Sequence, residues 1–275
     1  MKIQIYDSSG NKEREISSDI FDAPIRNDII QKIVEIERLD ERQPWAPFLW
    51  AGMQTSASGN VKHNRHVWKT DRGKGMSRFP KKRMSDKGDR FQWTGAVSPE
   101  TRGGRRAHPP KVIRQYVKIN KKEKIFAFKS GLAMIASLDL IRKKYSTLQN
   151  AEIKIRFPAA IDTKFLALKS KEFFNALNKI LGENVMNVAL QEARVRNGIG
   201  KMRNRRYKKN AGLLLIIGNN EQKKISGIDV VNVKDLRLMD IAENGARLTL
   251  FSEEAIKELE NKLKWLRSSR QQKKV

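Results

Sequence analysis

The stretch Leu213-Leu-Leu-Ile-Ile217 contains five consecutive apolar residues and is followed at once by Gly218. A short apolar run without alternation is typical of a strand that is buried on both faces of a parallel sheet. Three other segments have strand patterns: residues 153–157, 230–233 and 247–251. The second half of the chain therefore predicts several strands, one of which is buried on both faces.

Apolar residues recur at helical spacing before, between and after these strands. Such spacing predicts helices at residues 27–39, 121–144, 165–181, 185–195, 234–241 and 252–265. Ser252 is the expected N-cap of the last helix, and residues 3–6 are expected to form a short strand before a turn. Strands that alternate with helices favour an α/β fold, a parallel-type sheet flanked by helices that is Rossmann-like.

The positive charge of the chain is large and unevenly distributed. There are 57 Lys and Arg residues against 30 Asp and Glu residues, a formal net charge of +27. Residues 1–44 hold seven basic and ten acidic residues, a net charge of −3, whereas residues 52–118 hold 17 basic and four acidic residues, a net charge of +13. Residues 194–209 add eight basic residues and no acid. This excess indicates an anionic partner in the working state.

Residues 43–110 show neither helical nor alternating periodicity. They contain six prolines and eight glycines, and so long a segment without a pattern is either disordered alone or ordered by a partner. Aromatic residues are interleaved with the basic ones, which is unusual for a plain linker. Arg and Lys neutralise phosphates, and Arg and Trp planes stack on unpaired bases. RNA is favoured over duplex DNA, because the sequence shows no helix-turn-helix, zinc finger or heptad dimer and an irregular arm suits folded RNA.

Membrane insertion, catalysis and metal binding are not expected. No stretch approaches the roughly 18 apolar residues of a spanning helix, no secretory signal is visible, and the sequence has no cysteine, which fits a reducing cytosol. His63 and His66 stand three apart without cysteine or clustered acids nearby, and His108 adjoins two prolines, so neither a metal site nor a catalytic histidine is expected. The glycine runs at residues 73–75 and 198–201 lack the full phosphate-loop spacing. No cofactor is expected.

Five blocks of sequence resemble one family. They are Trp50-Ala-Gly-Met-Gln-Thr-Ser56, residues 73–83, Arg102-Gly-Gly-Arg105, Ala127-Phe-Lys-Ser-Gly-Leu-Ala133 and Gly198-Ile-Gly-Lys-Met-Arg-Asn-Arg-Arg206. In this order they resemble the universal large-subunit ribosomal protein four family (uL-four), over about residues 1–266. The long C-terminal extension of eukaryotic members is missing, so the resemblance is to the archaeal form.

The resemblance implies a cytoplasmic, structural constituent of the large ribosomal subunit. Residues 1–44 and 111–266 would form an α/β domain on the subunit surface, with residues 267–275 as a basic tail. Residues 45–110 would run into the large-subunit rRNA, and their tip would help to form the constriction of the nascent-peptide exit tunnel. The tunnel-lining candidates are Arg72, Gly73, Lys74, Gly75, Ser77 and Arg78. The implied partners are large-subunit rRNA, neighbouring large-subunit proteins and the nascent polypeptide.

The candidate rRNA contacts come from the basic runs and from the blocks that carry the resemblance. They are Trp50, Gln54, Lys62, Arg65, Trp68, Lys69, Lys81, Lys82, Arg83, Arg90, Trp93, Arg102, Gly103, Gly104, Arg105, Arg106, Lys111, Arg114, Arg194, Arg196, Lys201, Arg203, Asn204, Arg205, Arg206 and Lys208. Two alternatives stay open. A DNA-compacting chromatin-type protein would prefer duplex DNA, and an RNA-modifying enzyme would need a cofactor-binding glycine turn after a strand. The nearest such turn, Gly218-Asn-Asn220, is expected to be an ordinary one.

Overall fold

The computed structural model describes residues 1–59, 66, 78–87, 90–112, 117–151, 153 and 155–268. The chain forms two compact units. Unit 1 consists of Met1–Glu41 and Lys118–Val275, and unit 2 consists of Arg42–Val117. No helix in the described part of the chain has the length and apolarity that a membrane span requires.

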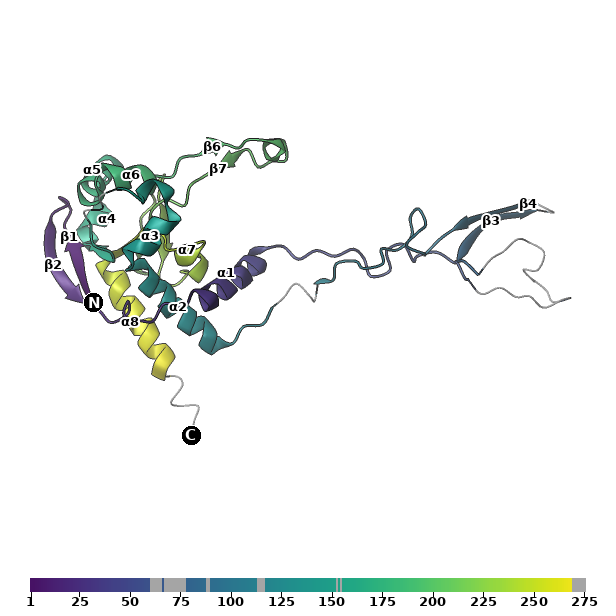
Figure 1. Cartoon of the computed structure of the whole chain (residues 1–275), viewed down its shortest axis with the longest axis horizontal. Helices are drawn as coiled ribbons and strands as arrows, with labels where there is room; N and C mark the ends of the chain where they lie inside the picture. The colour runs from purple at the N-terminus through teal and green to yellow at the C-terminus, as the bar shows by residue number, and fades with distance from the viewer. Residues whose placement is uncertain are drawn as a thin grey trace. The chain divides into compact units, whose positions relative to one another are not determined.

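A six-stranded sheet forms the centre of unit 1, in the order β2-β1-β5-β10-β8-β9 (Figure 1). The strands are β1 (Lys2–Tyr6), β2 (Lys12–Ser17), β5 (Ala159–Ile161), β8 (Leu214–Ile217), β9 (Asp229–Asn232) and β10 (Thr249–Ser252). Every neighbouring pair is parallel except the edge pair β1–β2. All four side chains of β8 are buried, which confirms the fully buried strand predicted from its apolar run.

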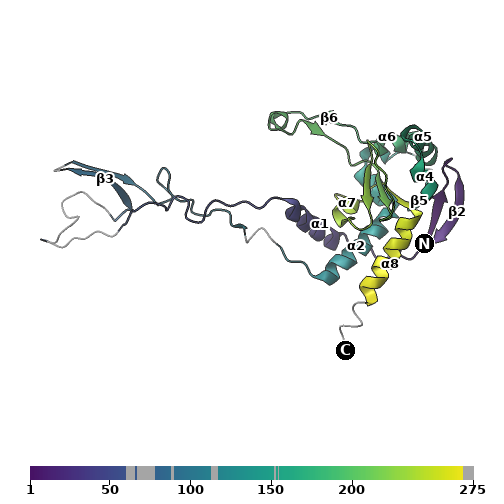
Figure 2. The same cartoon turned by 180° about the vertical axis from the view of Figure 1, so that it is seen from behind.

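Helices flank this sheet. They are α1 (Asn27–Glu41), α2 (Lys121–Ile135), α3 (Leu138–Lys144), α4 (Thr163–Ala167), α5 (Ser170–Leu181), α6 (Glu183–Ala189), α7 (Leu238–Ala242) and α8 (Glu253–Ser268), with a 3-10 turn at Ser146–Leu148. Helices α1, α2 and α7 pack together, α5 packs against α6, and α8 packs against β8 and β10. Both views of unit 1 show α4, α5 and α6 as a separate group (Figures 1 and 2). A mostly parallel sheet flanked by helices is therefore confirmed.

The core between sheet and helices is built from aliphatic and aromatic side chains. Phe165 and Phe173 meet edge to face with ring centroids 5.0 Å apart, and both are fully buried. Each such side chain contributes about 1.5–3 kcal/mol through the area it removes from water. Ser252 caps α8, since its Oγ accepts a hydrogen bond from Ala255 N at 3.1 Å, as its place before two glutamates predicted.

Two strands of unit 1 differ from the predictions. The strand expected at residues 153–157 is wrong, because the strand is β5, which begins at Ala159. Ile155 and Phe157 are buried, so their alternation reflects burial outside the ladder. Strand β2 was not predicted, because at Lys12–Ser17 the only large apolar residue is Ile16, as suits a solvated edge.

Four helix predictions had the wrong bounds. The helix expected at residues 234–241 begins only at Leu238, as α7. The helix expected at residues 121–144 is two helices, because Ser137 has an extended backbone (φ −90°, ψ 109°). The helix expected at residues 165–181 is likewise divided at Leu168 (φ −61°, ψ 147°). The helix expected at residues 185–195 ends at Ala189. Spacing of apolar residues continues across such breaks because both helices pack on the same core.

Unit 2 contains a β-hairpin where no regular structure was expected. Strand β3 (Lys81–Lys87) pairs antiparallel with β4 (Arg90–Gly95), and the register shifts between Arg83 and Ser85. A single bridge joins Ser58 to Lys81. The hairpin escaped prediction because β3 carries charged or polar residues on both faces, which removes the alternation that a half-buried strand shows.

Candidate RNA interface

Residues 194–209, termed the basic arm here, leave the body of unit 1 as a short hairpin with a turn at its tip (Figures 1 and 2). Strand β6 (Arg194–Val195) pairs antiparallel with β7 (Tyr207–Lys208). The tip is a 3-10 turn at Ile199–Met202. All residues of the arm are exposed except Arg196 and Gly200, which are half-buried.

Backbone hydrogen bonds hold the tip of the arm in one conformation. Arg203 N and Arg205 N both donate to the carbonyl oxygen of Gly200, at 3.2 and 3.1 Å. Gly198 (φ 82°) and Asn204 (φ 60°) occupy left-handed conformations, which glycine adopts freely and asparagine tolerates better than most residues. The tip is thus a folded turn.

Arg196 stabilises the arm through its guanidinium. Its Nε donates to Arg205 O at 3.2 Å and its Nη2 to Tyr207 O at 3.4 Å. A Cβ at Gly200 would lie 2.9 Å from Arg196 Cδ, so glycine leaves room for this side chain. Arg196 therefore ties the two sides of the arm together, a role that the sequence did not reveal.

The remaining cations of the arm point to a binding surface for phosphate. Arg194 forms an ion pair with Glu192 at 3.0 Å, and the Arg206 guanidinium lies 5.6 Å from the centre of the Tyr207 ring. Six exposed cations form no ion pair with any described residue: Lys201, Arg203, Arg205, Arg206, Lys208 and Lys209. Uncompensated cations on one projection attract and neutralise phosphates.

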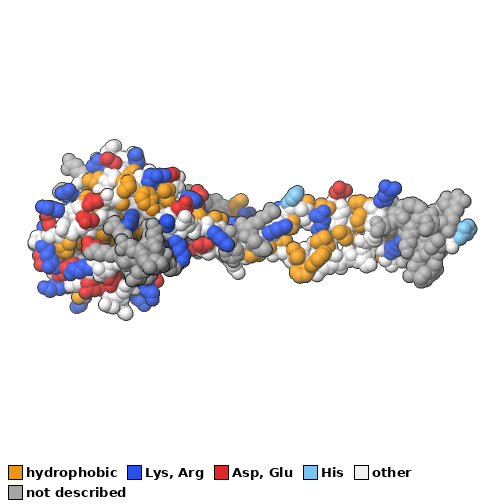
Figure 3. All heavy atoms as spheres, turned by 90° about the horizontal axis from the view of Figure 1, so that it is seen from below, with side chains coloured by type: hydrophobic (Ala, Val, Ile, Leu, Met, Phe, Trp, Pro, Cys, Tyr) orange, Lys and Arg blue, Asp and Glu red, His pale blue; other side chains and the backbone are white. Residues whose placement is uncertain are grey.

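The body of unit 1 has a different charge arrangement. On the face that Figure 3 shows, Lys and Arg side chains are intermixed with Asp and Glu. Ion pairs link Arg14 to Glu253, Lys32 to Glu123, Arg38 to Glu243, Lys124 to Glu37 and Arg237 to Glu41. Many cations of the body are thus compensated locally, while those of the arm are not.

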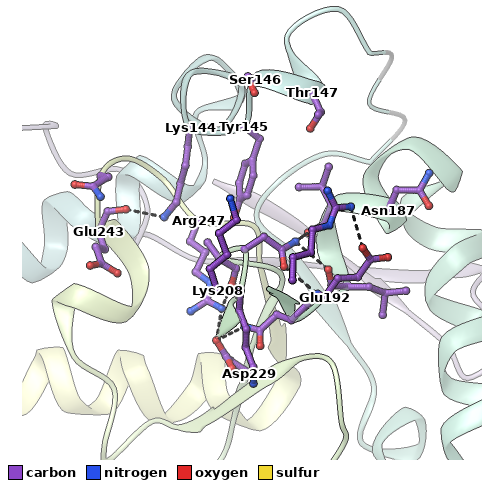
Figure 4. A pocket seen from close by; sticks show the side chains of 18 of the residues that line it. Lys144, Tyr145, Ser146, Thr147, Asn187, Glu192, Lys208, Asp229, Glu243 and Arg247 are labelled. Carbon is purple, nitrogen blue, oxygen red and sulfur yellow. Dashed lines mark hydrogen bonds and ion pairs between the residues drawn. The ribbon is translucent and has the colours of Figure 1, made fainter. Parts of the chain in front are cut away.

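A network of hydrogen bonds fixes the root of the arm to the body (Figure 4). Asn210 Nδ2 donates to the carbonyl oxygens of Val188 and Leu190, at 3.0 and 2.9 Å. The buried Arg247 pairs with Asp229, and its Nε donates to Gly212 O at 3.2 Å. A buried charge is tolerated when it is paired and hydrogen-bonded in this way.

A polar cavity of about 840 Å³ lies beside this root, and Lys144, Tyr145, Asn187 and Lys208 are among its lining residues (Figure 4). Burial, together with the nearby Arg247 guanidinium, lowers the pKa of Lys144 to about 8, and Glu243 partly opposes this shift. The Lys144 ammonium donates to the carbonyl oxygen of Glu243 at 2.7 Å. Lys144 thus supports the end of α7.

The candidate contacts of unit 2 divide according to whether the structure describes them. Described candidates are Trp50, Gln54, Arg78, Lys81, Lys82, Arg83, Trp93, Arg102, Gly103, Gly104, Arg105, Arg106 and Lys111. Outside the described residues lie Lys62, Arg65, Trp68, Lys69, Arg72, Gly73, Lys74, Gly75, Ser77 and Arg114, as well as the side chain of Arg90. Across the hairpin, the Arg83 guanidinium lies 5.4 Å from the centre of the Trp93 ring.

Two glycines of unit 2 allow its outgoing and returning segments to meet. A Cβ at Gly52 would lie 2.4 Å from the carbonyl carbon and oxygen of Gly104, so only glycine permits this approach, termed the glycine crossing here. Around it, Gly104 N donates to Thr101 O and Arg105 N to Val97 O, both at 3.1 Å. The crossing places Trp50 and Arg105 in one folded part of unit 2.

Three carboxylates of unit 1 could each offer an oxygen ligand. Asp7, Glu13 and Asp162 have carboxylate oxygens within 4.8 Å of one another. Asp162 also caps α4, since it accepts a hydrogen bond from Thr163 N at 2.8 Å, and a hydrogen bond from the Ser8 backbone lowers the pKa of Asp7. Capping accounts for Asp162 and turn formation for Asp7. Of the histidines considered above, His63 lies outside the described residues and His108 is exposed.

Comparisons with known proteins agree with the resemblance noted in the sequence. The family model of the ribosomal protein L4/L1 family matches residues 14–262. The chain is 31% identical to the large ribosomal subunit protein uL4 of Methanospirillum hungatei, over 94% of this chain and 98% of that protein. It is 30% identical to the protein of the same name from Methanocaldococcus jannaschii, over 95% and 99% of the two chains. This chain therefore belongs to the ribosomal protein L4/L1 family.

Proposed function

We propose that the chain is a structural constituent of the large ribosomal subunit and binds large-subunit rRNA through its basic arm and unit 2. Membership of a family of ribosomal proteins supports the place in the subunit and a role without catalysis. The observation that carries RNA binding is the set of six exposed arm cations that form no ion pair among the described residues.

Two physical effects make the arm suitable for this task. Each phosphate that a Lys or Arg neutralises releases condensed counterions, which favours binding. The arm backbone is already folded by the bonds to Gly200 O and by the root at Asn210. Binding therefore orders mainly side chains, which costs less free energy than ordering a flexible segment.

The finer parts of the proposal rest on the resemblance. Residues 72–78 are proposed to reach the nascent-peptide exit tunnel, where the nascent polypeptide would pass them. Of these residues the structure describes Arg78, which is exposed. Neighbouring large-subunit proteins would contact unit 1. Chemical footprinting of large subunits assembled with and without residues 52–110 tests the threading, which fails if protection deep within the rRNA is unchanged.

The arm can be tested through the salt dependence of binding. The variant Arg203→Ala/Arg205→Ala/Arg206→Ala should weaken binding to a large-subunit rRNA transcript and reduce the slope of log K against log salt by about 2 to 3. The matched control is Lys164→Ala/Lys171→Ala/Lys179→Ala, which removes the same charge from exposed positions on α4 and α5.

Three outcomes separate the candidates. A reduced slope in the arm variant but not in the control supports phosphate contacts by the arm. If both variants reduce the salt slope equally, only the net charge of the chain matters, which contradicts a defined interface. A preference for duplex DNA over the transcript at matched salt would instead favour the DNA-compacting alternative.

A further inference from the structure

Unit 2 exposes a cluster of large apolar side chains at residues 45–50, termed the aromatic turn here. The exposed fractions are 60% for Trp45, 62% for Phe48, 75% for Leu49 and 56% for Trp50. In unit 1, by contrast, five phenylalanines are at most 3% exposed: Phe21, Phe157, Phe165, Phe173 and Phe251. Contiguous exposed apolar side chains generally mark a binding surface.

The aromatic turn is held by its own backbone. Ala51 N donates to Phe48 O at 2.9 Å and Met53 N to Trp50 O at 2.8 Å. Gly52, which lies between Ala51 and Met53, has φ +77° and packs against the backbone of Gly104. Phe48 and Trp50 therefore project from a fixed base, which limits the conformational entropy that binding would cost.

The surroundings of the aromatic turn are basic. A Cβ at Gly52 would lie 2.5 Å from Arg105 N, so the returning segment with Arg102 and Arg106, both exposed, passes directly beside the turn. Residues 42–59 contain no acidic residue. A purely apolar protein surface would leave these guanidinium groups without partners, whereas single-stranded nucleic acid offers both flat bases and phosphates.

We propose that the aromatic turn stacks on unpaired nucleobases of the RNA, with Phe48 and Trp50 as the stacking planes and Arg102 and Arg106 as contacts for the adjoining phosphates. This inference rests on the proposed RNA-binding function and adds the class of RNA element that unit 2 recognises. Aromatic faces accept any base, so the aromatic turn selects single-stranded over duplex RNA without selecting sequence.

The experiment uses the full chain and two RNA probes. One is a single-stranded adenine-rich oligonucleotide of roughly 20 nucleotides, which is longer than one stacking site. The other is a duplex of the same length. In the variant Phe48→Leu/Trp50→Leu, apolar bulk and net charge stay but the π-faces are lost. We expect single-strand affinity to fall about 5- to 150-fold for each base that was stacked. Duplex affinity and the salt slope should stay as in the wild type.

Two further variants serve as controls. Trp50→Phe keeps a flat ring and should bind the single strand nearly as the wild type does. Met84→Ala removes another exposed apolar side chain of unit 2 (68% exposed) and should leave the affinity unchanged.

The outcomes distinguish this inference from the function on which it rests. If the wild type binds neither probe, the proposed function fails. If the wild type binds the single strand and the leucine variant binds it equally well, the function stands and the stacking inference is overturned, with a protein neighbour as the remaining occupant of the turn. An equal loss on single strand and duplex also overturns it, because duplex bases are not available for stacking.

Discussion

The glycine crossing makes a sharp prediction for two adjacent positions of unit 2. At Gly104, a Cβ would lie 2.0 Å from Ser98 O and 2.5 Å from Thr101 Oγ1. At Gly103, a Cβ would meet no atom within 4 Å, although φ is +74°. Gly104→Ala should therefore open the returning segment, while Gly103→Ala should only strain it.

The magnitudes follow from the contacts. Relief of the clash at Gly104 breaks the hydrogen bonds from Gly104 N to Thr101 O and from Arg105 N to Val97 O, at about 1 kcal/mol each. Overpacking adds about 1–3 kcal/mol, so the local cost is about 3–5 kcal/mol. Gly103→Ala carries only the left-handed strain of about 1–2 kcal/mol.

Amide hydrogen exchange of the full-length chain measures this difference. In the wild type the Arg105 amide should exchange more slowly than an unprotected amide. In Gly104→Ala its exchange should accelerate by about 150- to 4,000-fold, or until it reaches the unprotected rate. Gly103→Ala should accelerate it by roughly tenfold, as expected from its smaller strain. Equal exchange rates in the two variants, or an unprotected Arg105 amide in the wild type, would refute the claim that close packing at Gly104 holds the returning segment folded.

Two more predictions concern the root of the arm. Arg247→Met should lower the stability of unit 1 by about 2–3 kcal/mol, because Asp229 and the carbonyl of Gly212 lose a buried donor. Arg14 pairs with Glu253, but its side chain is 51% exposed against 10% for Arg247, and Glu253 keeps Lys257 as a second partner. Arg14→Met should therefore cost under ~1 kcal/mol, and equal shifts in thermal denaturation would contradict this ranking. Lys144 has its pKa lowered to about 8 from 10.5, so the folded chain releases this proton before the unfolded chain does. The free energy of unfolding of the wild type, relative to that of Lys144→Met, should therefore rise between about pH 8 and 10.5. Denaturant unfolding in which the two proteins differ by a constant amount across this range would exclude the effect.

The architecture of unit 1 was predictable where burial alone decides the structure. The apolar run at Leu214–Ile217 predicted a strand buried on both faces, and Ser252 before two glutamates predicted the start of a helix. Prediction failed where polar sequence forms strands. Strands β2 and β3 pair through backbone groups, and their charged side chains carry no periodic signal. Tertiary pairing, and not local pattern, produces these strands.

The candidate interface was predictable as a distribution of charge but not as a set of roles. Composition identified residues 194–209 and the basic runs of unit 2. It could not separate Arg196 from Arg203, because both are arginines in one basic run. Nor could it show that Trp45 and Phe48 are exposed, since aromatic residues that follow a proline are as readily buried as exposed. These distinctions depend on which backbone carbonyls and glycines lie nearby.

Arginines of the basic arm illustrate why a run of charge is not a run of contacts. The Arg196 guanidinium donates to Arg205 O and Tyr207 O, so two of its five N–H donors are engaged before any RNA arrives. The neighbouring Arg205 contributes a backbone carbonyl to this bond and keeps its own side chain exposed. Arg196 thus fixes the backbone conformation from which the Arg205 side chain can reach a phosphate. Because the cost of ordering that backbone is met during folding, more of the electrostatic free energy of the exposed cations remains available for RNA binding.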